Sequence, residues 1–323
     1  MDKKSVRSKI SALVNQYGIY MMFVLLVIAS SIISPKFLTY KNLISVSKQI
    51  SVTAVMAFGM TLLIISGQID LSMGSTIAMA GMVSINAFLS TGSYVFAFVV
   101  ACAIAMLIGY INGHLITTLK LPGFIATMSM DIVVRGAVYL YTGGSPIYQI
   151  GEYGKVSTTY VGVFPLPVII MVIVGIICFV ILKYTRFGRS LYACGGNIDA
   201  AEASGINVGR VKRIAFIVSG AFVGIAAVLQ MARLNSGLPD TAEGYHADAI
   251  ASAVIGGTSF TGGTGTAVGT IVGAFIIGII SNILNLCGVQ SYVQQIVKGA
   301  IIITVVSFDL LGKARKIRKI NKN

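Results

Sequence analysis

Long, continuously apolar runs dominate the pattern of hydrophobic and polar positions along this chain, and short polar segments separate them. A hydrocarbon core about 30 Å thick requires roughly 20 apolar residues for each helical crossing. Strands of a membrane barrel would instead show segments of about ten residues with alternating polarity. The pattern therefore predicts an all-α integral membrane protein, with residues 1–323 forming one transmembrane domain of about ten helices. The expected segments are approximately Gly18–Ser34, Ser51–Ser66, Leu71–Ser90, Tyr94–Ile116, Phe124–Tyr141, Val161–Leu182, Ile214–Ala232, Ala247–Thr258, Thr266–Leu286 and Val289–Phe308.

Two places in this pattern do not fit complete helices. The second and third segments are separated only by Gly67–Asp70, and the eighth segment, Ala247–Thr258, is too short to span comfortably. Non-helical backbone is tolerated at membrane depth where protein buries it or where it lines a polar path. We therefore expect broken or re-entrant helices at both places. A weak similarity between Ile65–Gln68 and Ile255–Thr258 is consistent with a duplicated break.

Composition supports the same class of protein. The chain is 56% hydrophobic and only 11% charged, with a mean hydropathy of +0.88, which exceeds what a soluble surface tolerates. The formal net charge of +14 raises the question of nucleic acid. Its cations, however, cluster beside apolar runs, where anionic lipid headgroups attract them. We therefore expect contact with membrane lipid and none with nucleic acid.

The basic residues that flank the segments predict the orientation, because such residues stay in the cytoplasm. With the amino terminus inside, the outer side receives Lys36, Lys41, Lys48 and Lys155. The inner side receives Lys3, Lys4, Arg7, Lys9, Lys120, Lys183, Arg186, Arg189, Arg210, Lys212, Arg213, Lys313, Arg315, Lys316, Arg318, Lys319 and Lys322. Both termini and the basic tail 309–323 are therefore predicted to be cytoplasmic in a multi-pass protein of a bacterial inner membrane. The first segment resembles a signal peptide, but no convincing small-x-small cleavage site precedes Pro35, so we expect a retained helix.

Few residues carry recognisable catalytic chemistry. The only histidines are His114 and His246, and the four cysteines stand singly, without the spacing of metal ligands. The segment Gly257–Thr264 has glycines at the spacing of a phosphate-binding loop, but Gly263 stands where that loop needs lysine. This segment is either a flexible break or a tight turn. We predict no catalytic residue, no metal and no cofactor on this chain, which is therefore not expected to be an enzyme.

The longest predicted cytoplasmic connection, residues 183–213, contains its own short helix signal. Asp199 and Glu202 fit a capping pair and Gly205 suits a left-handed stop, which predicts a helix over Asp199–Ser204. A short helix between two spans, flanked by basic residues, is suited to docking a partner. On these residues alone, an ordinary capped surface loop is the simpler interpretation.

Four groups of residues, in order along nearly the whole chain, carry a family likeness. They are Gly59–Ser75, then Phe124–Gly136 with Tyr141–Ile147, then Gly195–Asn207, and then Asp248–Ser259 with Gly262–Gly265. Together they resemble the ribose-type sugar permeases of ATP-binding-cassette importers, in a superfamily that also holds branched-chain amino-acid permeases. Gly195–Asn207 resembles the cytoplasmic coupling segment of that family. One departure is Gln68, where the family pattern has a small residue, and this leaves local flexibility or substrate choice in doubt.

The resemblance implies a mechanism that the residues alone do not. Two permease subunits, as a homodimer or a heterodimer, would form the pathway, and an extracytoplasmic sugar-binding protein would deliver a small sugar such as ribose. Two ATPase domains on partner chains would hold ATP and magnesium. Their closure would reach the spans as a rigid-body tilt, through the coupling residues Asn197, Asp199, Ala200, Glu202, Ala203, Gly205 and Asn207. An amino acid or a nucleoside is the alternative substrate.

Two other classes of membrane protein stay open. An ion-coupled secondary transporter would need ligands for the coupling ion and would gain nothing from a capped cytoplasmic helix. An intramembrane enzyme would need catalytic groups at facing positions, and His114 and His246 are predicted on opposite sides. Both are weaker interpretations than a permease subunit.

Ionisable residues inside spans need partners, since each costs about 2.5 kcal/mol or more at mid-membrane by insertion scales. Asp131 and Arg135 are four residues apart and share a helix face, which predicts a structural ion pair. Lys298 has no local acid. Its partner must therefore come from another helix, with Asp70 or Asp248 as candidates.

Polar residues in or near the breaks are the candidate contacts for a translocated sugar, because they can bind hydroxyl groups without strong retention. They are Ser66, Gln68, Asp70, Ser72, Ser75, Asn86, Asn282 and Asn285. Hydrogen bonds between helices explain many polar residues in spans equally well. Glycines repeated every four residues predict close helix packing, namely Gly265, Gly269 and Gly273, Gly220 and Gly224, and Gly109 and Gly113.

Overall fold

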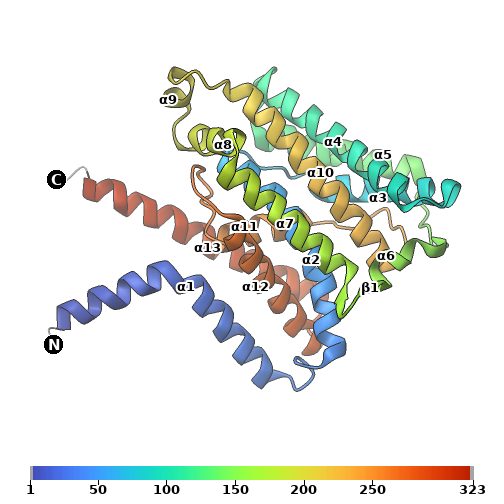
Figure 1. The fold of residues 1–323 in the computed structure, drawn as a ribbon, viewed down its shortest axis with the longest axis horizontal. Coiled ribbons are helices and arrows are strands. Elements are labelled where there is room, and N and C mark those ends of the chain that lie inside the picture. The colour runs from blue at the N-terminus through green and yellow to red at the C-terminus, as the bar shows by residue number, and fades with distance from the viewer. Residues whose placement is uncertain (1–2, 321–323) are drawn as a thin grey trace.

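The computed structural model confirms an all-α membrane architecture (Figure 1). It describes the backbone of residues 3–320 and the side chains of residues 18–307, 309 and 310, so most of the predicted basic tail lies outside the described side chains. The helices and strands in chain order are α1 (Lys3–Ile33), α2 (Tyr40–Ile65), α3 (Met73–Thr91), α4 (Tyr94–Thr117), α5 (Gly123–Thr142), the 3-10 helix η1 (Gly151–Gly154), α6 (Lys155–Thr158), β1 (Tyr160–Val161), β2 (Phe164–Pro165), α7 (Leu166–Tyr184), α8 (Arg186–Gly196), α9 (Ile198–Ala203), α10 (Val208–Leu234), α11 (Tyr245–Ile255), α12 (Ala267–Leu286) and α13 (Ser291–Ile320).

Each predicted membrane segment overlaps one of these helices. Among the described residues, seven helices are long and apolar enough to cross a bilayer, namely α2, α3, α4, α5, α7, α10 and α12. The described parts of α1 and α13 contain shorter apolar helical segments, Gly18–Ile33 and Ser291–Ser307. Helix α11, with 11 residues, is too short to cross a bilayer. The multi-pass architecture is therefore clear, while the number of complete crossings stays a prediction.

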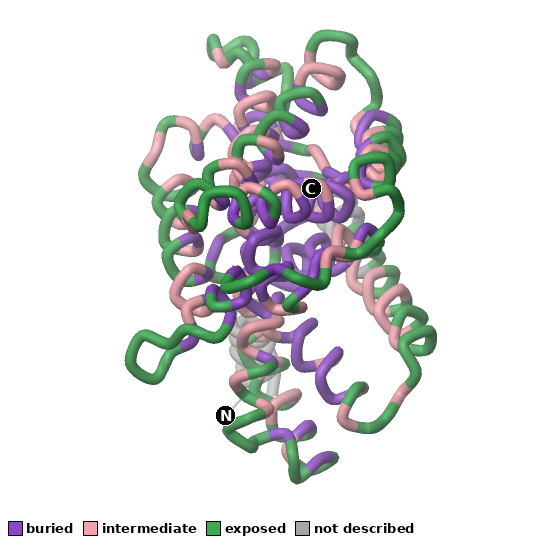
Figure 2. The backbone as a smooth tube through the Cα atoms, turned by 90° about the vertical axis from the view of Figure 1, so that its right-hand side faces the viewer, coloured by how far each residue is buried: buried purple, intermediate pink, exposed green. Residues whose placement is uncertain are grey.

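The centre of the bundle is formed by α2 and α10. In their most apolar windows, 83% and 72% of the residues are buried, against 28%, 22% and 28% for α4, α5 and α7. Figure 2 shows the same division, with buried positions gathered in the middle of the molecule and exposed ones at its periphery. The peripheral helices present large apolar side chains outward, as expected for surfaces that meet lipid or another subunit.

Glycines bring α4 and α10 into close contact, as the repeated spacing predicted. A Cβ added to Gly109 or to Gly220 would lie 2.4 Å from a carbonyl oxygen of the opposite helix. One added to Gly113 or to Gly224 would lie 3.0 Å or 2.6 Å from a Cα atom there. Only hydrogen fits at Gly109, Gly220 and Gly224, and a methyl group at Gly113 would be tight, so the two backbones pack directly on each other.

A second glycine contact joins α11 to α12. Added Cβ atoms on Gly269 and Gly273 would lie 1.9 Å and 2.0 Å from the carbonyl oxygens of Gly256 and Ser252. Gly265 precedes α12 and contacts other groups, so only two of the three predicted glycines pack helix on helix here.

Some predicted boundaries were wrong at the polar ends of the helices. The helix predicted to begin at Ser51 begins at Tyr40, because lysines that end an apolar run do not end a helix. The segment predicted to begin at Val161 starts instead with an antiparallel pair of short strands, and α7 follows from Leu166.

The bundle has two opposite ends, which correspond to the predicted sides of the membrane. In Figure 1, α8 and α9 lie at the upper left, and the start of α1 and the end of α13 lie at the left. Helix α6, strand β1 and the connection from α1 to α2 lie towards the lower right. The first end collects the predicted cytoplasmic segments and is called the inner face below; the second is called the outer face.

Candidate coupling segment and translocation path

The connection predicted to couple the chain to a partner contains two helices. Only Asn197 separates α8 from α9: its backbone N–H donates to the Ala193 carbonyl (3.1 Å), and its Oδ1 accepts from the Ala200 N–H (3.0 Å). Asn197 therefore ends one helix and caps the next. The predicted capping role of Asp199 was wrong. Asp199 lies in the first turn of α9, where a carboxylate complements the helix dipole.

Helix α9 forms an exposed tip on the inner face. Every predicted coupling residue within Asn197–Asn207 is exposed, while Ala201 on the opposite side of α9 is 3% exposed and anchors the helix. Gly205 adopts φ 79°, which confirms the predicted left-handed stop. The segment thus offers a fixed, solvent-facing surface, and its contact with an ATPase stays a prediction.

A pocket of about 520 Å³ separates this coupling segment from the end of α2. Ser66 and Gln68, two of the candidate path residues, line it together with Cys194–Asp199. The pocket lies beside the predicted cytoplasmic tip, so these two residues lie near the coupling segment. Burial raises the pKa of the Cys194 thiol in its wall, although nearby Lys212 opposes that rise.

The two predicted helix breaks have the same backbone structure. Gly67 and Gly257 adopt left-handed φ values of 76° and 84°. Each donates its N–H to the carbonyl three residues before it, and Gln68 and Thr258 donate to carbonyls five residues before them. This is the Schellman pattern that ends a helix at a glycine. The ends of α2 and α11 therefore share one backbone structure. Because α9 and α12 end in the same way at Gly205 and Gly288, the duplication of the break stays a prediction.

The eighth predicted segment, Ala247–Thr258, is the short helix α11 and its glycine ending. Residues 235–244 contain no helix, and α11 follows them towards the inner face. Gly237 exchanges two backbone hydrogen bonds with Ile147 (both 2.8 Å), and a Cβ on Gly74 would lie 2.5 Å from the Ala242 carbonyl oxygen. The non-helical stretch therefore packs against the start of α3.

Asp131 and Arg135 of α5 hold this region, but not as the predicted ion pair. The ion pairs found among the described residues lie elsewhere. Arg135 Nη1 donates to the carbonyls of Pro239 (2.6 Å) and Thr241 (3.1 Å), and Asp131 Oδ1 accepts from the Ser75 N–H (3.4 Å). The ion-pair prediction was wrong because interrupted helices leave backbone groups that need partners inside the bundle. Arg135 therefore holds the non-helical stretch 235–244, and Asp131 holds the start of α3.

Two other charged side chains, one half-buried and one buried, also have polar partners. Lys298 Nζ donates to Asp248 Oδ2 (2.8 Å), which confirms one of the two predicted partners and links α13 to α11. Asp70 instead accepts from the N–H and Oγ of Ser72 (2.8 Å and 2.6 Å) and from Asn112 Nδ2 (3.4 Å). Asp70 and Ser72 are buried, so this cluster orders the connection into α3.

The candidate amides further from the breaks connect helices. Asn282 exchanges two side-chain hydrogen bonds with Asn42 (2.9 Å and 3.1 Å), and Asn285 accepts from Gln294 (2.8 Å). Asn86 donates to a tyrosine hydroxyl of α5 (2.6 Å). These contacts explain the amides without a substrate, and their role in a sugar path stays a prediction.

Comparison with known proteins supplies the family. A family model described as the permease component of a branched-chain amino acid transport system matches residues 42–306. The chain is 39% identical over 302 residues to the ribose import permease of Escherichia coli K12, covering 92% of this chain and 94% of that protein. The chain belongs to this permease family. It is also 40% identical to the ribose import permease of Bacillus subtilis strain 168 (96% and 97% covered) and 34% identical to the galactose/methyl galactoside import permease of E. coli K12 (93% and 95%). No solved structure matches the chain.

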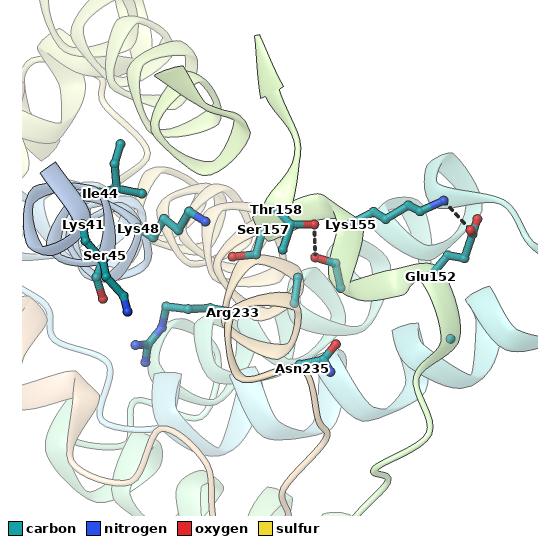
Figure 3. A pocket seen from close by; sticks show the side chains of 13 residues that line it. Lys41, Ile44, Ser45, Lys48, Glu152, Lys155, Ser157, Thr158, Arg233 and Asn235 are labelled. Atoms are coloured by element: carbon teal, nitrogen blue, oxygen red, sulfur yellow. Dashed lines mark hydrogen bonds and ion pairs between the residues drawn. The ribbon is translucent and has the colours of Figure 1, made fainter. Parts of the chain in front are cut away.

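The outer face of the permease contains a cationic pocket that the sequence analysis missed (Figure 3). It encloses about 770 Å³ between α2, η1, α6 and the end of α10. Lys41, Lys48 and Lys155, which are three of the four predicted outer lysines, line it together with Arg233. Glu152, the one carboxylate in this lining, pairs with Lys155 and raises its pKa. The lining residues are far apart in the chain, so no local sequence pattern indicates this pocket. The small number of lysines on the outer side was the only sequence signal for it.

Arg233 connects this pocket to the non-helical stretch of the permease. Its Nε and Nη2 donate to Gln230 Oε1 (3.3 Å and 3.2 Å). Gln230 Nε2 in turn donates to the Tyr245 hydroxyl (3.2 Å) and to Thr241 Oγ1 (3.4 Å). A change at the outer pocket can therefore reach the start of α11 through two side chains.

Proposed function

We propose that this permease is the membrane-spanning subunit of an ATP-driven importer for a small sugar. The observation that carries the proposal is the exposed helix α9, fixed by Asn197 at the end of α8 on the inner face. A short, capped and rigidly mounted helix suits insertion into a groove of a partner and transmission of its movement. Relatives named for the import of ribose, allose and galactose support a sugar as the substrate.

The energy would come from partner chains. Because the chain lacks a phosphate-binding loop with its lysine, ATP and magnesium would bind to two ATPase domains that dock on α9.

A second permease subunit, identical or homologous, would complete the pathway. Asp240 and Glu243 are exposed in the non-helical stretch that Arg135 of α5 holds. Charged side chains that face lipid at membrane depth are costly. A second subunit would shield them and leave a water-filled path between the two copies.

On the outer face, the cationic pocket would receive acidic side chains of an extracytoplasmic binding protein. Lys41, Lys48 and Arg233 form no ion pair within the described part of the chain. Positive charges without a neutralising partner attract an acidic surface and speed its association. The hydrogen bonds from Arg233 through Gln230 would carry this docking to the start of α11.

Purification of the tagged chain in mild detergent, from membranes that contain the partner proteins, tests the proposal. The wild type should retain an ATPase and, in proteoliposomes supplied with binding protein and ATP, should accumulate a labelled monosaccharide. Glu202→Arg and Gly205→Glu should lose the ATPase, because both alter the exposed tip of the coupling segment. Glu152→Arg makes the same charge reversal on the outer face and should retain it.

Two results would refute the proposal. One is an ATPase that stays bound at the wild-type level in both tip variants. The other is sugar accumulation that needs an ion gradient and not ATP.

An amino acid is the second candidate substrate, because the description of the matching family model names branched-chain amino acid transport. Uptake of labelled ribose, galactose and leucine by the same proteoliposomes separates the two substrates.

A further inference from the structure

The carboxyl-terminal end of α8 contacts, at one point, the end of α2 and the loop that follows α11. The segments α2–α3 and α11–α12, which these two breaks divide, are called the interrupted segments below. The Gly263 N–H donates to the Ile65 carbonyl (2.9 Å), which ties the loop after α11 to the end of α2. Gly195 of α8 packs directly over this hydrogen bond. A Cβ added to Gly195 would lie 1.8 Å from the Ile65 oxygen and 2.6 Å from the Gly263 nitrogen. No side chain larger than hydrogen fits there.

Two further contacts hold the loop between α11 and α12 in this place. The Tyr192 hydroxyl of α8 donates to the Gly265 carbonyl (2.8 Å). From the other side, Asp309 Oδ2 of α13 accepts from Ser259 Oγ (3.0 Å) and from the Phe260 N–H (3.2 Å). The loop therefore cannot shift relative to α8 or α13 without breaking hydrogen bonds.

The contact is made almost entirely of backbone. Added Cβ atoms on Gly262 and Gly263 would each lie 2.9 Å from backbone atoms of Gly195 and Gly196. Close-packed groups without rotatable side chains transmit a displacement instead of absorbing it. Helix α9 follows α8 after Asn197 alone, so a displacement of α9 reaches this contact directly.

We propose that Tyr192 and Gly195 of α8, with Ile65, Gly263 and Gly265, form the joint through which movement of α9 reaches both interrupted segments together. This set is called the inner joint below. The inference rests on the proposed function, because it assumes that an ATPase moves α9. Tyr192 and Gly195 are positioning residues, since they act through the backbone that they contact and not on the substrate.

Each arm of the inner joint leads to polar groups inside the bundle. From Ile65 the chain continues into α3, whose first turn is held by Asp131 of α5 at the Ser75 N–H. From the loop it returns along α11 to Asp248, which pairs with Lys298 of α13. A displacement at the joint would therefore shift both arms at once, as a rigid-body change of access requires.

Adjacent glycines provide a matched test of this inference. Gly195→Ala forces α8 away from the joint, whereas a Cβ on Gly196 meets nothing within 4 Å and Gly196→Ala leaves the joint unchanged. Both variants are assembled with the ATPase and the binding protein in proteoliposomes. The readout is the amount of labelled sugar transported per ATP hydrolysed, for whichever of D-ribose, D-allose or D-galactose the wild type imports.

We expect Gly195→Ala to retain the ATPase and to lower this ratio by about tenfold, within the usual range of coupling between sites. Gly196→Ala should keep the wild-type ratio. Equal ratios in the two variants would overturn the inference. If Gly195→Ala does not assemble, Tyr192→Phe decides, because it removes only the hydroxyl bonded to Gly265. A lower ratio in Tyr192→Phe supports the joint, and an unchanged ratio overturns it.

The wild-type complex separates the two levels of failure. If the wild type retains no ATPase and transports no sugar with ATP, the proposed function fails, and the joint fails with it. If the wild type transports sugar and only the variant predictions fail, the proposed function stands without the joint.

Discussion

The inner and outer faces of the permease differ in the groups that form them: packed backbone at the inner joint and charged side chains at the outer pocket. Apart from the Tyr192 hydroxyl, the inner joint consists of glycines and backbone groups in direct contact, so that a methyl group added at Gly195 would lie 1.8 Å from a carbonyl oxygen. The outer pocket consists of long charged side chains around a space of about 770 Å³. A contact that passes on movement must be stiff, whereas a surface that captures a partner needs room and unpaired charge.

The two faces should therefore respond to different perturbations. Exposed charges act over roughly 8 Å at physiological salt and weaken as salt increases. Packed backbone acts only at contact distance and is insensitive to salt. Added side-chain volume should damage the inner joint, and added salt or reversed charge should damage the outer pocket.

The largest effect is expected for Gly263→Ala in the inner joint, compared with Gly67→Ala nearby. Both glycines adopt φ 76°. A Cβ on Gly67 meets nothing within 4 Å, whereas one on Gly263 would lie 2.9 Å from the Gly196 Cα. Gly67→Ala should lower the free energy of unfolding by about 1–2 kcal/mol, because alanine disfavours the left-handed backbone. Gly263→Ala should lower it by about 2–5 kcal/mol, because overpacking adds to the same backbone cost. Unfolding in increasing dodecyl sulfate measures both, and equal losses would show that the joint is not tightly packed.

A smaller effect is expected from charge reversal in the outer pocket. Lys48→Glu with Arg233→Glu should weaken the binding of the loaded binding protein to nanodisc-embedded complex by about tenfold at low salt, since exposed ion pairs contribute roughly 0.2–1 kcal/mol each and steer association. The loss should fade as salt is raised. Lys36→Glu is the matched control for Lys48→Glu alone, because each reverses one charge and Lys36 is an exposed outer lysine outside the pocket. If Lys36→Glu weakens binding equally, general outer charge and not the pocket attracts the partner.

Local patterns predicted those parts of the fold that depend on neighbouring residues. Apolar runs gave the helices, and single glycines gave the ends of α2 and α11, because Gly67 and Gly257 supply the left-handed backbone that a Schellman ending requires. The sequence left only two candidate partners for Lys298, because few acidic residues lie within the predicted spans and breaks. Asp248 is the one that lies opposite it.

The parts that failed depend on segments far apart in the chain. Arg135 was assigned to Asp131 by helix spacing, but its acceptors are carbonyls of the non-helical stretch, whose path no local pattern fixes. Helix α8 was missed because Gly188, Gly195 and Gly196 lower its helix propensity, and tertiary packing overrides that cost. The outer pocket joins residues from α2, α6 and α10, so its cations could be seen only singly in the sequence.

The smallest expected effect is slow alkylation of Cys194, the residue before Gly195 in the inner joint. Its side chain is 1% exposed, and burial raises the pKa of its thiol despite the opposing charge of Lys212. The thiolate is the reactive form. At neutral pH less of it exists than for an ordinary thiol, so the rate should keep rising with pH beyond the range where an ordinary thiol levels off.

Iodoacetamide labelling of the purified permease, followed by mass spectrometry of each cysteine peptide, measures this rate. Cys287 is exposed and serves as the internal control. Cys194 should react severalfold more slowly at neutral pH, because it is both buried and less ionised. Equal rates at the two cysteines would mean that the inner face opens freely without a partner. That result would exclude a stiff joint at the inner face. A low alkylation rate of Cys194 that increases when the ATPase binds nucleotide would instead show that α8 moves.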